Sequence, residues 1–358
     1  MATSFKTFDD KDSTVTRNLL HEAIPITGSI VSGTYADNNI KNFSHGMFQS
    51  VYDYPFLSSS ANHIFDLTCG YAAASVLSGA ASTQNAKKIN VYNELAQVLV
   101  GFDANGAVRT FDDDGDFSTT TGKINEAYFV NFSRLLSKDE IKKGSFTLTL
   151  GVSGATDASA YASPFASTIS LTDKSGSNGY KVNSPAGEYG ILYATGSMLA
   201  AAGVDSLGFV KAGLLYYQAG IAVITASVFG SLLTTPVSMS TTDPSAINTF
   251  LSGTNINGNC DGLRHRVDNI SFNNTVELNS TIYFCRVNNT DFNYSSNPTY
   301  LSSSKMVVKN NSQDLPVSYV TTVGLYSPDN ELLGVAKLSE PLKKDPATEF
   351  NLRVRLDY

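Results

Sequence analysis

The feature that most constrains the fold is a series of short strand-like stretches at the end of the chain. Residues 280–287, 305–309, 318–327, 331–338 and 350–358 are rich in aliphatic, β-branched and aromatic residues, with turn residues between them. Short runs of this composition, bounded by turn residues, predict β-strands. Short strands at this spacing are typical of a β-sandwich or a barrel.

The last of these stretches shows the pattern most clearly. Its aliphatic and charged residues alternate in the order Leu352, Arg353, Val354, Arg355, Leu356 and Asp357. We expect the aliphatic face to belong to a core and the charged face to meet water or a partner. Upstream, Pro328-Asp329-Asn330 is a turn signal that predicts a hairpin between two of the stretches.

The first two thirds of the chain contain further strand patterns. Residues 145–152 alternate Phe, Leu, Leu and Val with polar residues, which predicts a half-buried strand. Residues 127–136 are strand-like, and the pattern at 208–229 indicates a strand, a turn and a second strand.

A few short helices are also expected. Apolar residues at helical spacing predict a helix over 87–100, which Gly101 should end. The capping-box spacing at 137–140 predicts a helical turn that ends at Gly144, and 244–251 indicates another short helix.

These patterns predict a mainly β protein with β-sandwich or jelly-roll-like domains and a few short helices. We expect an N-terminal arm at 1–60, a β-rich domain with one amphipathic helix at 61–235, and a C-terminal β-sandwich domain at 236–358. The arm has weak periodicity but scattered aromatic residues, which suggests a segment ordered on a neighbour. The connection at 231–260 is rich in Ser, Thr, Pro, Gly and Asn, and it sets the second boundary.

The charge content bears on the partners. Charged residues make up only 16%, below the roughly 25% usual in soluble domains. Either partners bury much of the surface, or neutral Ser, Thr and Asn side chains solvate it. A net charge of −7 argues against nucleic-acid binding, and no uninterrupted apolar run is long enough for a membrane helix. We therefore expect neither nucleic acid nor a membrane as partner.

One acidic loop is a weak candidate for a metal site. Asp112, Asp114 and Asp116 have the 1-3-5 spacing of a calcium loop. An EF-hand needs Gly at position six and Glu at position twelve, but here Gly115 is at position four and Lys123 at position twelve. An EF-hand is thus excluded, and we interpret the loop as a solvated acidic turn, with a different divalent site as the alternative.

No motif indicates catalysis, so we expect no enzyme, no catalytic residue and no cofactor. The sequence has no GxSxG, P-loop or dinucleotide fingerprint, its four histidines are isolated, and its three cysteines are far apart. A glycosidase carboxylate pair is not excluded by the linear sequence, although few Glu and no Trp argue against it.

The C-terminal stretch carries a family resemblance. VTTVGLYSPDNELLGVAKLSEPLKK, followed by FNLRVRLDY, resembles tail-fibre attachment domains of tailed bacteriophages. Those domains show a strand ending in Gly-[Leu/Ile]-Tyr, an Asp/Asn turn, and a strand of the form [EL]-L-[LIV]-[AG]-V-A. Here 323–326, 328–330 and 331–338 correspond to these three parts.

The resemblance extends upstream. Residues 271–300, together with INVYNELAQVLVGFD, NFSRLLSKDEIKKGSFTLTLG and KAGLLYYQAGIAVITA, are similar to structural proteins of large contractile-tailed phages, notably marine cyanobacterial ones. The resemblance therefore covers roughly residues 60–358.

The resemblance implies a virion structural protein that is assembled in the host cytoplasm. It would be tail-associated, in the baseplate, neck, collar or fibre attachment, and would act by assembly as a homo-oligomer with other virion proteins. A capsid decoration or neck protein is an alternative, as is a host-binding adhesin or depolymerase. The implied docking residues are Val323, Gly324, Leu325, Tyr326, Leu333, Val335, Arg353, Arg355 and Tyr358.

Overall fold

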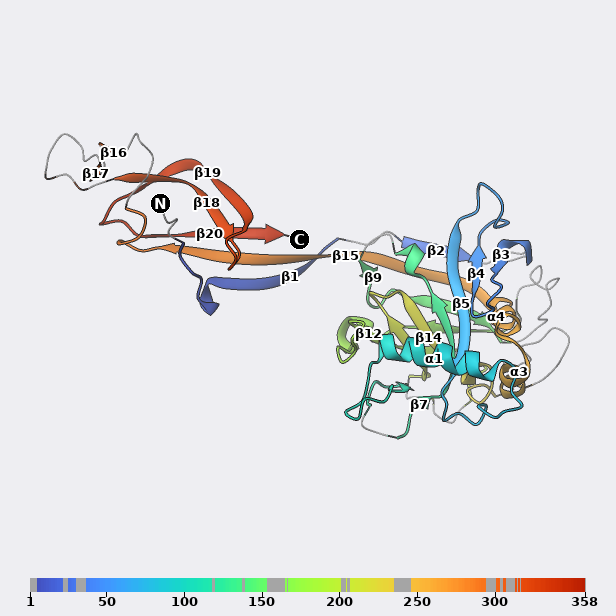
Figure 1. Ribbon diagram of the computed structural model, residues 1–358. Helices are drawn as coiled ribbons and strands as arrows, with labels where there is room; N and C mark the ends of the chain where they lie inside the picture. Colours follow the sequence, from blue (N-terminus) through green and yellow to red (C-terminus); the bar gives the residue numbers. More distant parts are fainter. Residues whose placement is uncertain are drawn as a thin grey trace. The chain divides into compact units, whose positions relative to one another are not determined.

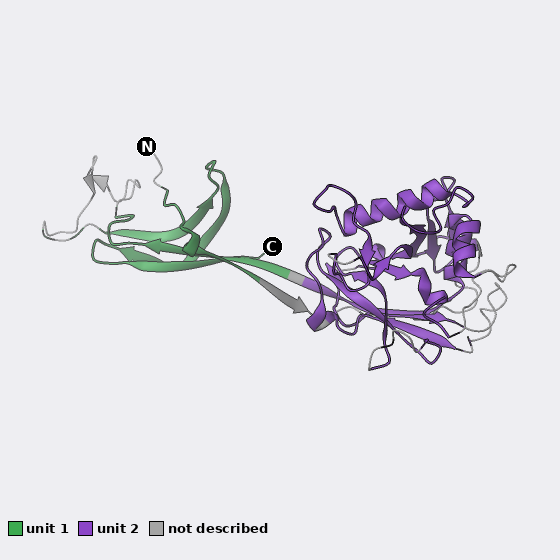
Figure 2. Ribbon diagram, turned by 90° about the horizontal axis from the view of Figure 1, so that it is seen from below, with its two compact units in different colours: residues 1–19, 277–358 green, residues 20–276 purple. Residues whose placement is uncertain are grey.

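The chain forms two compact units in the computed structural model (Figure 2). Unit 1 contains residues 1–19 and 277–358, and unit 2 contains residues 20–276. The structure describes residues 5–21, 25–29, 37–117, 120–136, 139–152, 165, 167–200, 204, 207–234, 246–293, 301–302, 305–306, 313, 315 and 317–357. The expectation of a mainly β chain with a few short helices is confirmed.

Unit 2 is built on one large antiparallel sheet (Figure 1). Its strands follow the order β15-β10-β11-β12-β13-β14-β8-β5-β4-β3, and β2 and β9 also pair with β15. The bounds are β2 Pro25–Ser29, β3 Ile40–Asn42, β4 Gln49–Tyr52, β5 His63–Tyr71, β8 Glu126–Asn131, β9 Glu140–Ile141, β10 Thr147–Gly151, β11 Thr168–Thr172, β12 Tyr189–Thr195, β13 Val210–Tyr216, β14 Ile221–Thr225 and β15 Val267–Val287.

Shorter elements complete unit 2. A two-stranded ribbon pairs β6 (Phe111–Asp112) with β7 (Lys123–Ile124). The α-helices are α1 Asn85–Leu99, α2 Gly176–Gly179, α3 Ile247–Gly253 and α4 Ile256–Arg264. The 3₁₀ turns are η2 Asp37–Asn39, η3 Ser133–Leu135 and η5 Ala226–Phe229. None of the helices in the described part of the chain is long and apolar enough to cross a membrane.

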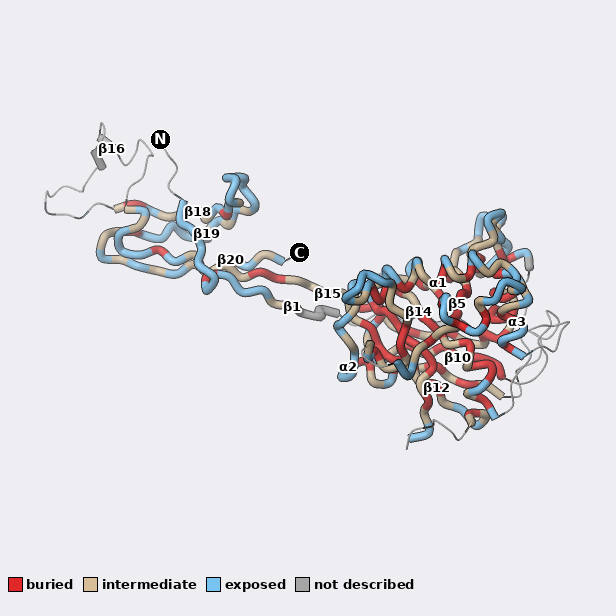
Figure 3. The backbone as a smooth tube through the Cα atoms, turned by 60° about the horizontal axis from the view of Figure 1, so that its bottom comes forward, coloured by how far each residue is buried: buried red, intermediate tan, exposed pale blue. Residues whose placement is uncertain are grey.

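The core of unit 2 follows from the alternation in β10. Phe146, Leu148, Leu150 and Val152 are all buried, as the pattern at 145–152 predicts. The ring of Phe146 lies 6.1 Å from that of Phe272 on β15. The strand–turn–strand expected at 208–229 is the β13–β14 hairpin, although 226–229 form η5 instead of continuing the strand. Buried residues are concentrated in this unit (Figure 3).

Helix α1 packs on β5 at very short range. It runs over the predicted residues, and Gly101, with a φ of +83°, follows its end as expected. A Cβ added at Gly70 on β5 would lie 2.5 Å from the backbone oxygen of Lys88 on α1. Only glycine permits this approach, because any side chain would push the helix away. Lys88 is itself buried, and its ammonium donates to the Thr254 carbonyl over 2.6 Å.

Unit 1 is a thin β structure in two layers (Figure 1). In one layer β1 (Ser13–His21) and β20 (Phe350–Asp357) pair with β15. The other layer is the hairpin of β18 (Ser318–Tyr326) and β19 (Leu332–Lys344), as the turn signal predicts. Asn330 in that turn has a φ of +65°. The unit also contains η1 (Asp10–Asp12) and the ribbon of β16 (Leu301–Ser302) with β17 (Lys305–Met306).

The described residues of the expected N-terminal arm, 1–60, are divided between the two units. Residues 40–42 and 49–52 are strands of the main sheet, in which Ile40 and Val51 are buried, and residues 1–19 belong to unit 1. These strands have three and four residues, too few to produce a recognisable period.

The compact units also divide at a different place from the expected boundary near 235. Residues 246–276 belong to unit 2, where α3 and α4 bury Leu251 and Leu263. The division lies between Val276 and Glu277, inside the continuous strand β15. A strand shared by two units has no linker composition, so the sequence shows no signal there.

Two local predictions also fail in part. The helical turn at 137–144 does not form over its described residues, because Glu140–Ile141 pairs with β15 as β9; residues 137–138 lie outside the described part. The helix predicted at 244–251 begins at Ile247, and 244–245 also lie outside the described part. Of the stretch 305–309, only Lys305–Met306 is described.

Candidate functional site

The predicted docking residues lie on the β18–β19 hairpin and on β20 of unit 1. Leu325 is buried, whereas Tyr326, Leu333 and Val335 are 45%, 66% and 55% exposed. Val323 is half-buried and Gly324 is exposed. The hairpin thus presents apolar side chains to solvent, which is typical of a surface that another molecule covers.

The alternation predicted for the last strand is confirmed. Arg353 and Arg355 are exposed on one face of β20, and Val354 is buried on the other. Arg355 Nε lies 2.6 Å from Asp357 Oδ1, so part of the charged face pairs within its own strand. Tyr358 lies outside the described residues.

Unit 1 has little core of its own. Among its described residues the buried apolar side chains are Val287, Leu325 and Val354, and they are still 7%, 6% and 8% exposed. In unit 2, by contrast, many apolar side chains have no exposed surface at all. Burial of apolar surface is the main force that stabilises a fold, so unit 1 gains little from its own contacts.

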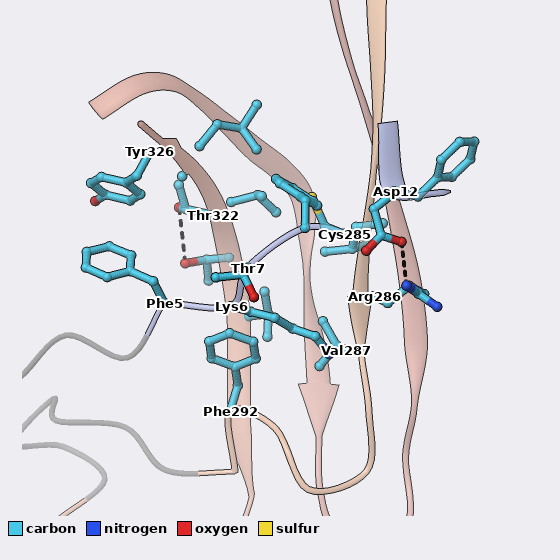
Figure 4. Close-up of a pocket in the computed structure, with 18 of the residues that line it drawn as sticks. Phe5, Lys6, Thr7, Asp12, Cys285, Arg286, Val287, Phe292, Thr322 and Tyr326 are labelled. Atoms are coloured by element: carbon cyan, nitrogen blue, oxygen red, sulfur yellow. Dashed lines mark hydrogen bonds and ion pairs between the residues drawn. The ribbon is translucent and has the colours of Figure 1, made fainter. Parts of the chain in front are cut away.

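A groove of about 830 Å³ lies between the layers of unit 1 (Figure 4). It is lined by β18, by β15 and by the N-terminal segment. Phe5 packs on Tyr326 with ring centroids 4.8 Å apart, which holds the N-terminal segment against β18. The aromatic residues that line the groove are Phe5, Phe8, Phe284, Phe292, Tyr319 and Tyr326.

Each charged side chain that lines the groove has an ion-pair partner. Arg286 Nη2 lies 2.7 Å from Asp12 Oδ1 and 3.2 Å from Asp9 Oδ2. The hydrogen bond from Arg286 lowers the pKa of Asp12. Lys6 pairs with Asp291, and this hydrogen bond lowers the pKa of that carboxyl. The groove is therefore an apolar, aromatic surface whose charges are already neutralised.

The groove also contains a thiol. Cys285 lines it and is half-buried, and burial raises the pKa of its thiol. Cys69 and Cys260 are fully buried in unit 2. Cys285 is thus the one accessible cysteine of the three, a property the sequence alone did not reveal.

The acidic loop of unit 2 is arranged differently from the sequence prediction. Carboxylate oxygens of Asp112, Asp113 and Asp114 lie within 4.8 Å of one another, so Asp113 takes the place predicted for Asp116. The backbone N–H of Asp116 donates to Asp114 Oδ1 over 2.9 Å. Such turns bring carboxylates together without any ion.

Two lysines pair with the carboxylates of this loop. Lys123 Nζ lies 2.7 Å from Asp112, and Lys211 Nζ lies 3.2 Å from Asp113 and 3.0 Å from Asp114. Burial raises the pKa of Asp112. Hydrogen bonds lower the pKa of Asp114, and the bond with Asp112 has the largest effect. The two ammonium groups offset two of the three carboxylate charges, so the geometry favours the interpretation as an acidic turn.

A buried polar cluster in unit 2 was not foreseen. Lys143 bridges Glu140 over 2.9 Å and Glu188 over 2.7 Å, and its ammonium lies 5.2 Å from the centre of the Tyr217 ring. Glu188 and Tyr217 are distant in sequence from Glu140 and Lys143, so no local pattern indicated the cluster. All three charged side chains are largely buried, so the cluster ties β9 to the start of β12.

Asp173 lies beside this cluster. Its carboxylate accepts hydrogen bonds from the backbone N–H of Gly144 over 2.7 Å and of Phe146 over 2.9 Å. Burial raises its pKa to about 6 despite these bonds. A raised pKa is one mark of a catalytic acid, but both oxygens are engaged in holding a loop, which supports a structural role.

Comparisons with protein-family models, curated proteins and solved structures found no match to this chain.

Proposed function

We propose that this chain is a structural subunit of a tailed bacteriophage particle, associated with the tail at the baseplate, collar or fibre attachment. It acts by oligomeric assembly and not by catalysis. The proposal joins the resemblance of the C-terminal stretch to the geometry of unit 1, because that stretch forms β18, β19 and β20.

The incomplete core of unit 1 is the observation that carries this proposal. A unit that buries so little apolar surface gains stability when a partner covers it. The exposed side chains of Leu333 and Val335 and the aromatic groove offer such surface. In a particle with many copies, neighbours would cover it in every copy.

Free strand edges support the same function. Among the described residues β18 and β19 pair only with each other, and β20 pairs only with β15. Exposed edges pair with other chains unless something covers or blocks them. A subunit held in a particle has its edges covered by neighbours, whereas a free monomer would tend to aggregate.

The test is to locate the chain in purified particles. Heads and tails would be separated and analysed by mass spectrometry, followed by cryo-electron microscopy with the chain traced in the density. We expect the chain in the tail fraction, with the β18–β19 hairpin of unit 1 against a neighbour. Its presence in heads alone would favour a capsid decoration or neck protein, and its absence from particles would refute the proposal.

The aromatic groove also favours a second candidate, a host-binding adhesin. Aromatic rings are suitable surfaces for the apolar faces of sugars, and the volume lies in the range of roughly 300–1,000 Å³ typical of ligand sites. Binding of purified protein to host cells, lost on Phe292→Ala but not on Val98→Ala in unit 2, would support this candidate over pure assembly.

A further inference from the structure

An uncharged apolar edge lies on the same unit as the groove. Leu332, Leu333 and Val335 of β19 are 53%, 66% and 55% exposed. Residues 332–336 contain no charged or polar side chain. None of the three apolar residues lines the groove of its own copy, so this edge is available to another molecule.

The groove has the chemistry to receive such a segment. Apart from paired charges at Asp12, Lys6 and Arg286, its lining is apolar, aromatic or hydroxylic, with one amide at Asn330 and the thiol of Cys285. A charged segment would lose its hydration there without gaining a free counter-charge, whereas an uncharged one loses little. The charges thus favour an apolar occupant.

The charge balance of unit 1 points to a second copy as that occupant. The sequence of unit 1 has eleven Lys and Arg residues against twelve Asp and Glu, so it carries about −1 of the net charge of −7. Copies of unit 1 therefore repel one another weakly, and low net charge promotes self-association. Each copy supplies one apolar edge and one apolar groove.

We propose that the groove of unit 1 receives the β19 edge, Leu332 to Val335, of a second copy of this chain. The inference rests on the proposed function and specifies its contact. Groove and edge are different surfaces, so the contact is heterologous, and repeated contacts close into a ring or extend as a filament.

The test uses the full-length protein and two single variants. Leu333→Glu places a charge on the edge, and Phe292→Glu places one in the groove. Analytical ultracentrifugation should show that the wild type associates as its concentration rises, and that either variant weakens association at least about 100-fold. Val335→Lys, on the same edge, should act like Leu333→Glu, and Leu57→Glu on unit 2, at an 86% exposed position, should associate as the wild type does.

A mixture of the two variants separates this contact from a symmetric one. The Phe292→Glu chain keeps an intact edge, and the Leu333→Glu chain keeps an intact groove. An equimolar mixture should therefore form a dimer that grows no further, although each variant alone is monomeric. If the wild type associates while the mixture stays monomeric, the contact is between like surfaces and the proposal is overturned.

Cys285 provides an independent readout. It lines the groove, while the other two cysteines are fully buried. A maleimide should label one thiol per native chain, and association should slow this labelling at least about tenfold, in proportion to the oligomer present. Equal labelling rates in monomer and oligomer would place the contact elsewhere and overturn the proposal.

The two proposals fail in different ways. A wild type that stays monomeric at every concentration, but is present in tails, would refute self-docking and leave the structural role intact. Its partner would then be another virion protein. A chain that associates through the groove but is absent from particles would refute the proposed function alone.

Discussion

Arg286 on β15 and Asp12 at the end of η1 form an ion pair, with 2.7 Å between Nη2 and Oδ1. The two residues are far apart in sequence, and the pair fastens the N-terminal segment to the strand at the centre of unit 1. The same segment forms one wall of the groove, through Phe5 and Phe8. The ion pair therefore contributes to the shape of the candidate assembly surface.

This pair makes unit 1 sensitive to acid. The pKa of Asp12 is lower in the fold than its ordinary value of about 3.9, so its contribution to stability is complete above that value. The contribution is lost as the pH falls through the folded-state pKa. Arg286→Gln should lower the urea midpoint of unit 1 at neutral pH, and this effect should become smaller as the pH falls through the folded-state pKa of Asp12. Arg353→Gln, on the exposed face of β20, is the control. An equal decrease in the urea midpoint for both variants would show that the Arg286–Asp12 ion pair does not stabilise unit 1.

Removing the last strand should unfold unit 1 alone. β20 pairs with β15 from Ser280↔Asp357 to Val287↔Phe350, and it contributes the buried Val354. Deletion of 350–358 should abolish the protection of unit 1 amides against hydrogen exchange, and it should also prevent incorporation of the chain into particles. Unit 2 should keep its amide protection because its core is separate. Asn351→Ala, at an exposed position of β20, is the control. Normal particles carrying the truncated chain would contradict the prediction.

The close approach of α1 to β5 gives a sharp test of packing in unit 2. Gly70→Ala would place a methyl group 2.5 Å from the Lys88 carbonyl oxygen, and overpacking of this kind costs about 1–3 kcal/mol. Gly79→Ala is the matched control, because no atom lies within 4 Å of its added Cβ. Urea unfolding measures the free energy of unfolding of both variants. Equal stability of the two variants would show that the helix shifts freely.

Asp173 should give unit 2 the opposite pH dependence from that of Asp12. Its pKa is about 6 in the fold, above the roughly 3.9 of an unfolded chain, so its contribution to stability is lost as the pH rises through 6. A pKa difference of this size lowers the free energy of unfolding by about 3 kcal/mol between pH 4 and pH 7.

Asp173→Asn should remove this slope, with a constant loss of about 1–3 kcal/mol because its amide cannot accept both backbone N–H groups. Urea unfolding of unit 2 at pH 4, 5, 6 and 7 measures the slope. Glu94→Gln, exposed on α1, is the control. If the pH dependence persists in Asp173→Asn, groups other than Asp173 cause it.

Calcium should not stabilise unit 2. Lys123 and Lys211 already pair with the carboxylates of the acidic loop. A site with a Kd of about 50 µM would raise the free energy of unfolding by about 2.7 kcal/mol at about 5 mM calcium, whereas we expect no change in melting temperature. Magnesium at the same concentration controls for ionic strength. A rise in melting temperature with calcium but not with magnesium would support a metal site in this loop.

Much of the local structure was predictable from particular residues. The alternation at 145–152 and 350–357 identified two strands and the faces they bury, and the helix at 87–100 was placed within two residues of its ends. These are features of chain periodicity, which neighbouring residues create together. The groove was not predictable, because Phe5, Cys285 and Tyr326 come from distant parts of the sequence and share no motif.

The sequence by itself determined that this protein is mainly β, which faces of β10 and β20 are apolar, and where the β18–β19 hairpin turns. Only the tertiary structure decided that β15 is shared by two units, that the first residues complete unit 1, and that Lys123 and Lys211 pair with the acidic loop. The physical reason is range: periodicity and turn chemistry act between neighbours, whereas strand partners and ion pairs are selected by the total free energy of contacts between distant segments.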